Sequence, residues 1–392
     1  MTPPEVVDTL ADEERMIVEM VRDFAANELE GIAREIDAEK RVPLDAIEKM
    51  RELGLFGLLI PEEFGGSEVR TIVSTRVIEE LSKVCAAVAI TVSVHNSVGA
   101  FPILLFGSDE QKKRFLPRLA SEMTGAFCLS EADAGSDAAS LKLRARRDGD
   151  AWVLDGTKMW VTNATQAGIF LVFARSDPDP SAGHRGITAF LVEKDAPGLS
   201  VSKLEDKMGL RASDTAELAF ESVRVSDSHR LGAEGDGFKV AMSALDNGRI
   251  GVGAQALGIA RAAFDEALRY AKERQQFGQP ISRFEGIRLM LAQMDTEIQT
   301  AALLVYRAAA MKDAGLPYGP QASMAKLYAS EAATRVTHAA VQIHGGYGYV
   351  KEYAVERYYR DARVTEIYEG TSQMQRIVIA RSLLGKQKRA TA

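Results

Sequence analysis

The stretch Ala151-Trp-Val-Leu-Asp-Gly-Thr-Lys-Met-Trp-Val-Thr162, with Ile169-Phe-Leu-Val-Phe173 after it, decides the fold class. Short apolar runs alternate here with turn residues such as Asp155-Gly156. Runs of the same kind recur between about residue 125 and residue 230, at 126–129, 141–145, 188–192 and 217–220, with a further turn signal at Asp148-Gly149. Short alternating runs at this spacing predict an antiparallel barrel or sandwich, not parallel βαβ units.

Helical periodicity flanks this segment on both sides. Before it, apolar residues recur at helix spacing from Ile17 to Ile36, a second helix is predicted from about Thr71 to Val84, and Ser108 begins a helix as its N-cap. After residue 235, four or five long helical segments are broken at 278–280, 315–320 and 345–348. We therefore predict an α+β multidomain protein. It has an N-terminal helical domain (1–122), a middle antiparallel β-barrel or sandwich (123–232) and a C-terminal four-helix bundle (233–392).

Composition excludes several functional classes. Hydrophobic residues make up 46% of the 392 residues and the net charge is −7, which argues against a chain-wide surface for nucleic acid. Cys85 and Cys128 form no metal-type spacing and are expected to be packing residues in a reducing compartment. The first residues lack a presequence pattern, and the apolar run 84–94 is too short to span a bilayer. A cytoplasmic protein with no membrane insertion is expected.

Two segments of the middle region suit a planar, electron-rich ligand. Phe127-Cys-Leu-Ser-Glu-Ala-Asp-Ala-Gly-Ser-Asp137 joins a strand to a loop of small residues, whose amides and hydroxyls can approach such a ligand. In Lys158-Met-Trp-Val-Thr-Asn163, Trp160 offers a stacking face and Thr162 a hydroxyl donor. Both features suit a flavin, which needs a covered ring and donors to its nitrogen and oxygens. The alternative for each segment is a barrel strand with a core tryptophan and a polar turn.

A candidate base lies near the C-terminal end, at Glu369 in Val364-Thr-Glu-Ile-Tyr-Glu-Gly-Thr-Ser-Gln-Met-Gln-Arg376. The segment predicts a turn before a helix that Thr371 or Ser372 could cap. Burial of this carboxylate would raise its pKa to about 6–7, which suits removal of a proton from carbon. The alternative is an exposed charge that compensates the helix dipole.

Together, FCLSEADAGSD, KMWVTN and EIYEGTSQMQR resemble the acyl-CoA dehydrogenase family, in this order in a helix–sheet–helix chain. The runs Glu273-Arg-Gln-Gln-Phe-Gly-Gln-Pro280 and Gln342-Ile-His-Gly-Gly-Tyr-Gly348 also fit. The resemblance is to the short- and medium-chain type of this family and covers essentially the whole chain. It rests on five motifs that occur in register.

The resemblance implies a role for each matching position. Glu369 matches the catalytic base. The positions that match the family's flavin-ring contacts are Phe127, Leu129, Ser130, Gly135, Ser136, Trp160, Val161 and Thr162. The positions that match its other FAD contacts are Arg274, Phe277, Gln342, Gly345 and Gly346, contributed across a subunit interface, and Thr371 and Gln373 beside the base. The positions that match its substrate contacts are Ser136, Asp246, Arg249, Tyr368 and Gly370. No metal is implied, since His344 has no second ligand at metal spacing.

The implied activity is α,β-dehydrogenation of an acyl-CoA thioester to trans-2-enoyl-CoA, as a step of fatty-acid β-oxidation. FAD is the implied cofactor, and an electron-transfer flavoprotein is the implied electron acceptor. The run Thr91-Val-Ser-Val-His-Asn-Ser97 resembles short-chain and short branched-chain versions, so a short to medium acyl chain is expected. The shared cofactor positions imply a homotetramer built as a dimer of dimers.

Other activities on the same scaffold remain as alternatives. An acyl-CoA oxidase differs in how its reduced flavin meets oxygen, and a nitroalkane oxidase needs Asp at position 369. A flavin-bearing nucleic-acid binder would be expected to carry a basic extension, whereas this chain is acidic. Ala132 stands where Pro is frequent in the family, and Glu285 where Gln is common, so Glu285 is left off the FAD set. The glycines from Gly251 to Gly258 are predicted to pack helices, because no strand precedes them as a dinucleotide fingerprint requires.

Overall fold

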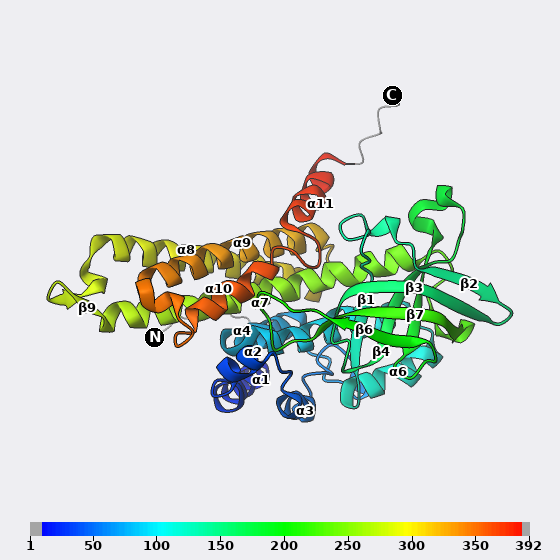
Figure 1. Ribbon diagram of the computed structural model, residues 1–392, viewed down its shortest axis with the longest axis horizontal. Coiled ribbons are helices and arrows are strands. Elements are labelled where there is room, and N and C mark those ends of the chain that lie inside the picture. The colour runs from blue at the N-terminus through cyan, green and yellow to red at the C-terminus, as the bar shows by residue number, and fades with distance from the viewer. Residues whose placement is uncertain (1–9, 386–392) are drawn as a thin grey trace.

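The computed structural model describes residues 10–385, apart from the side chain of Pro180. The start of the chain, on which the expectation about a presequence rests, lies outside these residues. The described chain passes from helices through a sheet and back to helices (Figure 1). The predicted architecture is therefore confirmed.

Short helices and one long core helix, α4, precede the sheet. They are α1 (Asp12–Phe24), α2 (Ala33–Glu39), α3 (Leu44–Glu52), α4 (Thr71–Val94), α5 (Phe101–Phe106) and α6 (Asp109–Ser121). Ser108 caps α6 as predicted. Its hydroxyl accepts from the Gln111 backbone N–H at 3.3 Å, while the Gln111 side chain accepts from the Ser108 N–H at 3.0 Å. This reciprocal pair is a capping box, which satisfies two otherwise unbonded donors at the helix start.

Helix α4 continues past its predicted end. Cys85 has non-helical dihedrals (φ −148°, ψ 94°), so Val84 precedes a kink and not a terminus. A π-helical turn, η3 (His95–Ala100), then leads into α5. The stretch from Thr71 to Phe106 is long and apolar enough to cross a membrane, but 83% of its most apolar window is buried in the protein. Its apolarity therefore reflects a place in the core. Cys85 and Cys128 are buried thiols, as expected of packing residues.

One mixed sheet forms the middle of the chain. Its strands are β1 (Thr124–Cys128), β2 (Arg144–Asp148), β3 (Ala151–Thr162), β4 (Ala167–Arg175), β5 (Ile187–Glu193), β6 (Leu199–Leu204), β7 (Thr215–Ser226) and β8 (Arg230–Leu231). The order is β6-β7-β3-β2-β4-β5-β8, with β1 added to β4. All strand pairs of this sheet are antiparallel except two: β1 pairs with β4 in parallel, and so does β2, through a single bridge. The sheet does not close into a barrel, and alternating residues bury both of its faces in separate cores.

Two bulges shape β3, and one of them replaces a predicted turn. Asp155-Gly156 lies inside the strand, where the register with β7 shifts. Gly156 has φ +142°, and a Cβ there would lie 3.0 Å from Leu143 Cα. A glycine in a strand often marks such a close approach, which local sequence does not distinguish from a turn. The second register shift falls between Lys158 and Val161 and gives Trp160 a φ of +61°. Asp148-Gly149 does form the predicted turn between β2 and β3.

The helices after the sheet form a long bundle. They are α7 (Gly237–Glu273), α8 (Glu285–Asp313), α9 (Gly319–His344), α10 (Val355–Val364) and α11 (Ser372–Leu384). Helix α7 packs against α4, α8 and α9. A Cβ at Gly258 would lie 2.4 Å from the Glu79 carbonyl oxygen of α4, and one at Gly253 would lie 3.0 Å from a Val305 methyl of α8. These glycines therefore let the helices approach closely, as predicted.

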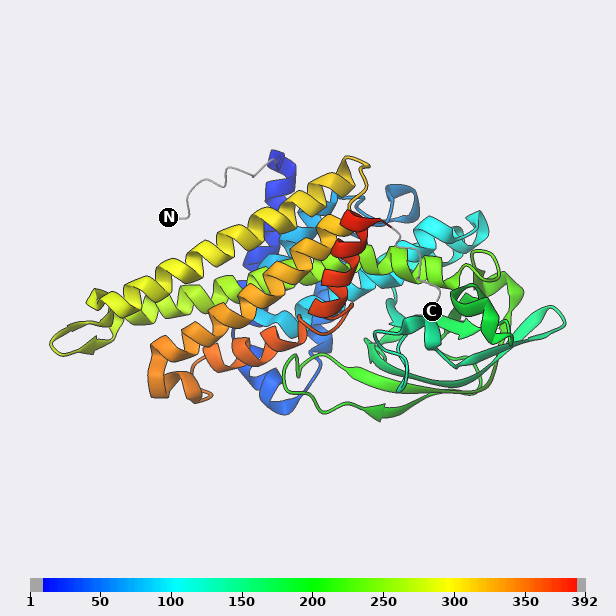
Figure 2. The ribbon, with the colours of Figure 1, turned by 90° about the horizontal axis from the view of Figure 1, so that it is seen from above.

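The bundle and the sheet lie at opposite ends of the molecule. Seen from above, α7, α8 and α9 run side by side away from the sheet (Figure 2). Strands β9 (Gln275–Gln276) and β10 (Gln279–Pro280) form a hairpin at the far end of the bundle. The loop between α10 and α11 lies near the junction of bundle and sheet (Figure 1).

Candidate active site

Glu369 lies in a tightly turned loop between α10 and α11. Glu369 has φ +52° and Gly370 φ +92°, two consecutive left-handed residues. The Ser372 backbone N–H donates to the Glu366 carbonyl at 3.0 Å, which closes the loop. Thr371 then caps α11 by accepting from the Met374 N–H at 3.3 Å, as the sequence predicted. A left-handed glutamate is uncommon and strained, so the surrounding contacts must hold it there.

The carboxylate of Glu369 points into the protein against helix α7. A Cβ added to Gly248 would lie 2.0 Å from Glu369 Oε2, so only glycine leaves room for this side chain. Oε2 is buried and has no hydrogen-bond partner among residues 10–385. Burial raises the pKa of Glu369 to about 7, and the charges of Lys326 and Arg249 oppose this rise. The side chain is thus not the exposed, dipole-compensating charge of the alternative interpretation.

Two buried cations flank this carboxylate. Lys326 of α9 is fully buried and donates to the Gly370 carbonyl at 2.6 Å. Burial lowers its pKa to about 8, against the opposing charge of Glu369. Arg249 of α7 is buried beside Gly248 and donates to Asp246, with the Ser323 hydroxyl 3.4 Å away. Asp246 and Arg249, both expected on the substrate side, therefore form one ion pair next to the base.

Tyr368 is held on the other side of the loop. Its hydroxyl donates to the Gln255 side chain of α7, and Gln255 Nε2 donates to the Ala86 carbonyl of α4 at 3.0 Å. Gln375 of α11 donates to the carbonyls of Glu369 and Gly370, at 3.2 and 2.8 Å. The loop is thus bonded to α7 through Tyr368 and to α9 through Lys326, and Gln375 of the following helix α11 bonds back to it.

Sequence reasoning missed three residues of this site: Gly248, Lys326 and Gln375. Lys326 carried a usable signal, because it is a single cation in the apolar run Ala325-Lys-Leu-Tyr-Ala329, where a buried lysine needs a partner. Gly248 had none, since its importance depends on a carboxylate more than a hundred positions away. Gln375 lay within the quoted motif, without a role.

The flavin-type loop after β1 is anchored by a buried ion pair. Lys158 of β3 is fully buried and donates to Glu131 at 2.7 Å and to the Leu129 carbonyl at 3.0 Å. Glu131 also accepts from the backbone N–H groups of Lys142 and Leu143, at 2.6 and 2.9 Å. One carboxylate thereby fixes both ends of the loop to β3.

The surface above this anchor is open and suits a flat ligand. Trp160 is 56% exposed, so it is not the core tryptophan of the alternative; that residue is Trp152. Gly135 and Ser136 are exposed, and a Cβ at Gly135 would meet no atom within 4 Å. Thr162 is half-buried at the end of β3. The other predicted ring contacts, Phe127, Leu129, Ser130 and Val161, lie on the same two segments and are buried or half-buried.

The end of α4 connects this surface with the base. Asn163, just after β3, donates to the Thr91 carbonyl at 3.2 Å. Two residues further along α4, the Ser93 hydroxyl lies 2.5 Å from where a Cβ of Gly251 would stand. Gly251 follows Gly248 by almost one turn of α7. Residues 91–97 thus bond to the end of β3 through Thr91 and lie through Ser93 against α7, within one turn of Gly248.

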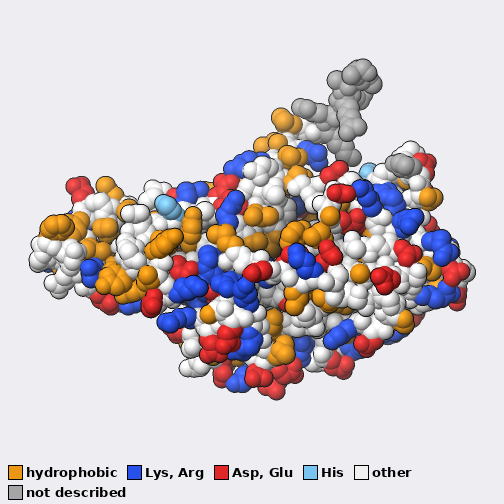
Figure 3. Space-filling model, in the orientation of Figure 1, with side chains coloured by type: hydrophobic (Ala, Val, Ile, Leu, Met, Phe, Trp, Pro, Cys, Tyr) orange, Lys and Arg blue, Asp and Glu red, His pale blue; other side chains and the backbone are white. Residues whose placement is uncertain are grey.

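The remaining predicted cofactor residues lie elsewhere. Arg274, Gly345 and Gly346 line a hollow of about 480 Å³ at the free end of the bundle, with Tyr270 and Tyr347. The Arg274 guanidinium lies 5.3 Å above the Tyr347 ring. Gln342 is exposed nearby on α9, and exposed apolar side chains gather at this end (Figure 3).

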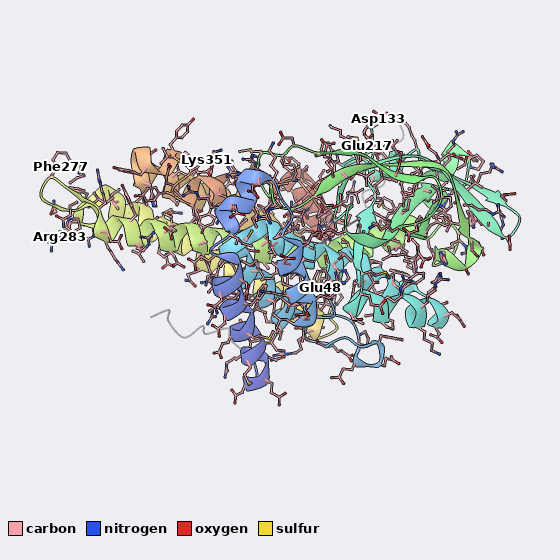
Figure 4. The ribbon with its side chains drawn as sticks, turned by 60° about the horizontal axis from the view of Figure 1, so that its bottom comes forward. Glu48, Asp133, Glu217, Phe277, Arg283 and Lys351 are labelled. Carbon is pink, nitrogen blue, oxygen red and sulfur yellow. The ribbon has the colours of Figure 1, made fainter. Side chains whose placement is uncertain are left out.

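One chain does not bring the two sets together. Phe277, at the hairpin tip, is 94% exposed. It lies at the opposite end of the molecule from Asp133 of the flavin-type loop (Figure 4). Thr371 and Gln373 are at the start of α11, with the base. Glu285 is exposed at the first position of α8.

Comparisons with known proteins cover most of the described chain. Family models match it at residues 11–123 (acyl-CoA dehydrogenase, N-terminal domain), 126–223 (middle domain) and 235–384 (C-terminal domain). It is 48% identical over 376 residues to the mitochondrial short-chain specific acyl-CoA dehydrogenase of Bos taurus, covering 96% of this chain and 91% of that protein.

Solved structures share the entire fold. Butyryl-CoA dehydrogenase from Megasphaera elsdenii superposes with a TM-score of 0.94 and 43% identity, over 96% of this chain and 99% of that one. A structure reported in work on the electron transferring flavoprotein of Acidaminococcus fermentans and flavin-based electron bifurcation gives a TM-score of 0.94 and 46% identity. It covers 97% of this chain and 100% of its own.

Proposed function

This chain belongs to the acyl-CoA dehydrogenase family and is an FAD-dependent oxidoreductase, and we propose that Glu369 is the base with which it desaturates a short acyl-CoA thioester. The observation that carries the proposal is Glu369 itself: the residue is half-buried, its Oε2 is buried and bonds to none of the described residues, and burial raises its pKa to about 7. A base of this strength is suited to proton removal near neutral pH.

The residues present fit FAD. The exposed Trp160 face, the open backbone at Gly135 and the half-buried Thr162 would hold the ring, over a loop that Lys158 and Glu131 keep in place. Thr371 and Gln373 would contact it beside the base. The chemistry that bound FAD supplies is the acceptance of two electrons with the β-hydrogen of the substrate.

The work of the chain itself is proton transfer and orientation. Glu369 takes the proton from carbon α, and the carbon–carbon bond becomes the trans double bond of the enoyl product. Negative charge develops on the thioester oxygen in this step. The Glu369 backbone N–H donates to no acceptor within residues 10–385, so it is available to that oxygen. Asp246 and Arg249 would contact the substrate on the α7 side, with Ser136, Tyr368 and Gly370 around it.

A small polar cavity beside Asn247, the neighbour of Gly248, is consistent with a short acyl chain. Gly251 and Ser93 line a cavity between α4, η3 and α7 that measures about 20 Å³, close to the size of one water molecule. Its other walls include Asn96, Ser97 and Asn247, which are polar. A long alkyl chain would have to displace these side chains. The similarity to a short-chain specific enzyme and to butyryl-CoA dehydrogenase supports the same assignment.

The two predicted sets of cofactor residues lie far apart on one chain, which favours a site completed by a second copy. Arg274 and Gln276 line the hollow beside β9, and Figure 1 shows β9 at the end of the molecule away from β3, the strand that carries Trp160. We therefore propose a homotetramer, built as a dimer of dimers, in which the hairpin end of one subunit meets the flavin surface of another. The nearly full exposure of Phe277 is consistent with such a contact. Light scattering of wild type and Phe277→Ala tests it. A monomer that retains full FAD occupancy would contradict the shared site.

The proposed electron acceptor is an electron-transfer flavoprotein, which the structural similarity to the Acidaminococcus fermentans protein supports. Oxygen uptake with substrate and no other acceptor separates this assignment from an acyl-CoA oxidase. Rapid uptake would favour the oxidase.

The decisive experiment compares wild type with Glu369→Gln. We expect turnover to fall roughly 10²–10⁴-fold, the range for a positioned acid–base group, while FAD stays bound. A panel of acyl-CoA thioesters, followed by flavin bleaching without oxygen, then ranks chain lengths. Near-normal turnover of Glu369→Gln would remove Glu369 as the base, and a preference for long chains would remove the assignment to short substrates.

A further inference from the structure

A polar stripe on α9 runs along the catalytic loop. Ser323, Lys326, Ser330 and Thr334 recur every three or four residues, so they share one face of the helix. The first three are fully buried. Ser330 donates to the Thr365 carbonyl at 2.8 Å, and Thr334 donates to the Glu366 side chain. Within an otherwise alanine-rich helix, these polar groups have their partners in the loop that carries Glu369, or in Arg249 beside it.

Lys326 has the most consequential position on this stripe. Its ammonium donates to the Gly370 carbonyl at 2.6 Å, and Gln375 donates to the same oxygen at 2.8 Å. Gln375 also donates to the Glu369 carbonyl at 3.2 Å. Lys326 of α9 and Gln375 of α11 thus bond to the carbonyls of Glu369 and Gly370, the two residues of the loop with positive φ.

We propose that Lys326 is a positioning residue for Glu369. With Gln375 it clamps the two carbonyls so that the carboxylate stays against Gly248, and its positive charge favours the ionised form of that carboxylate. The inference rests on the proposed role of Glu369 as the base. It goes beyond that role by assigning the base a charged partner that does not itself touch the reacting carbon.

The groups around the pair support a specific electrostatic coupling. Arg249 of α7 is the other cation that acts on Glu369. The charges of Glu366 and Glu331 also raise the pKa of Lys326, and the charge of Glu369 raises the pKa of Tyr368. Burial raises the pKa of Glu369, while Lys326 is the larger of the two charges that lower it. Removal of the Lys326 charge should therefore raise the pKa of the base.

The test separates charge from hydrogen bonding with two variants. Lys326→Met removes both, whereas Gln375→Leu removes a clamp donor without changing the charge. Because a misplacement of about 1 Å can cost about 10²-fold, we expect both variants to lower the plateau kcat by about ten- to 100-fold. Only Lys326→Met should move the acid limb of the kcat/KM profile, upward by about one pH unit or more.

Lys312 provides a matched control. It is a lysine on α8 whose pKa burial also lowers to about 8, but it donates to Asn247 at 2.6 Å and does not contact the loop. Lys312→Met should leave the acid limb in place. FAD content and melting temperature of each variant establish that it is folded.

An unmoved acid limb in folded Lys326→Met would overturn the electrostatic role. Unchanged plateau kcat in Gln375→Leu would overturn the clamp, even if Lys326→Met failed to fold. These outcomes are distinct from failure of the proposed function, which would appear as an active Glu369→Gln.

Discussion

Substitution of Gly248 by alanine should displace the base without unfolding the protein. The new Cβ would stand 2.0 Å from Glu369 Oε2, whereas ordinary contact begins at about 3.4 Å. The carboxylate must therefore retreat by about 1.4 Å, or α7 must move. Since a misplacement of about 1 Å can cost about 10²-fold in rate, we expect kcat to fall by at least that factor.

Stability should respond in the opposite sense. Gly248 lies inside α7, where alanine is favoured over glycine by about 0.5–1 kcal/mol. This gain partly offsets the cost of moving one carboxylate, so the melting temperature should change little. Activity and melting temperature, measured on the same FAD-loaded preparation, separate a displaced base from a damaged fold.

Two further variants make the reasoning refutable. Gly253→Ala is the control, because it changes the same helix but meets a Val305 methyl at 3.0 Å and not the base; it should keep most of the activity. In a Glu369→Asp background, whose shorter side chain leaves more room, Gly248→Ala should cost less than it does in wild type. Near-normal kcat in Gly248→Ala, or an equal loss of kcat in both backgrounds, would show that catalysis does not depend on the carboxylate lying against α7.

Three other predictions follow from named contacts. Burial raises the pKa of Glu369 from 4.5 to about 7, so the folded protein holds a proton that the unfolded chain releases between these values, and stability falls as pH rises through this window. In FAD-free protein, Glu369→Gln should therefore have a higher free energy of unfolding than wild type at pH 8, by up to roughly 3 kcal/mol, and the difference should nearly vanish by about pH 4; a constant difference would contradict this. Lys158→Met leaves Glu131 buried without its cation and should lose about 3–5 kcal/mol in urea unfolding, so an unchanged midpoint would refute the anchor. Trp160→Ala should weaken FAD binding but leave the melting of FAD-free protein unchanged, because the indole is 56% exposed; equal FAD affinity would remove the stacking role.

The fold was predictable where local signals decide it. Glycine and proline clusters gave the breaks of the bundle, and Ser108 gave the start of α6. The errors came from long-range contacts. Helix α4 resumes after Cys85 because its apolar residues have helices to pack against on several sides. Asp155-Gly156 stays within β3 because the neighbouring strands hold it and Leu143 crowds it.

The site was predictable only in part, for a related reason. Glu369, Thr371 and the two flavin-type segments stand in short motifs, where residue types and spacing carry the chemistry. Which surfaces face one another is a tertiary property. The predicted cofactor residue Phe277 lies far from Asp133 of the flavin-type loop (Figure 4), and only the fold reveals this separation.

The proposed role of Glu369 as the base depends on a balance between opposing effects on its pKa. Full burial with no cation nearby can raise the pKa of a glutamate to about 8–9, and such a group would be mostly protonated at neutral pH. Cations without burial would lower the pKa below its ordinary value and leave a weak base. The value of about 7 needs both, with burial the larger effect and Lys326 and Arg249 restraining it. Because the three groups come from α9, α7 and the loop before α11, the fold and not any one motif sets the strength of the base.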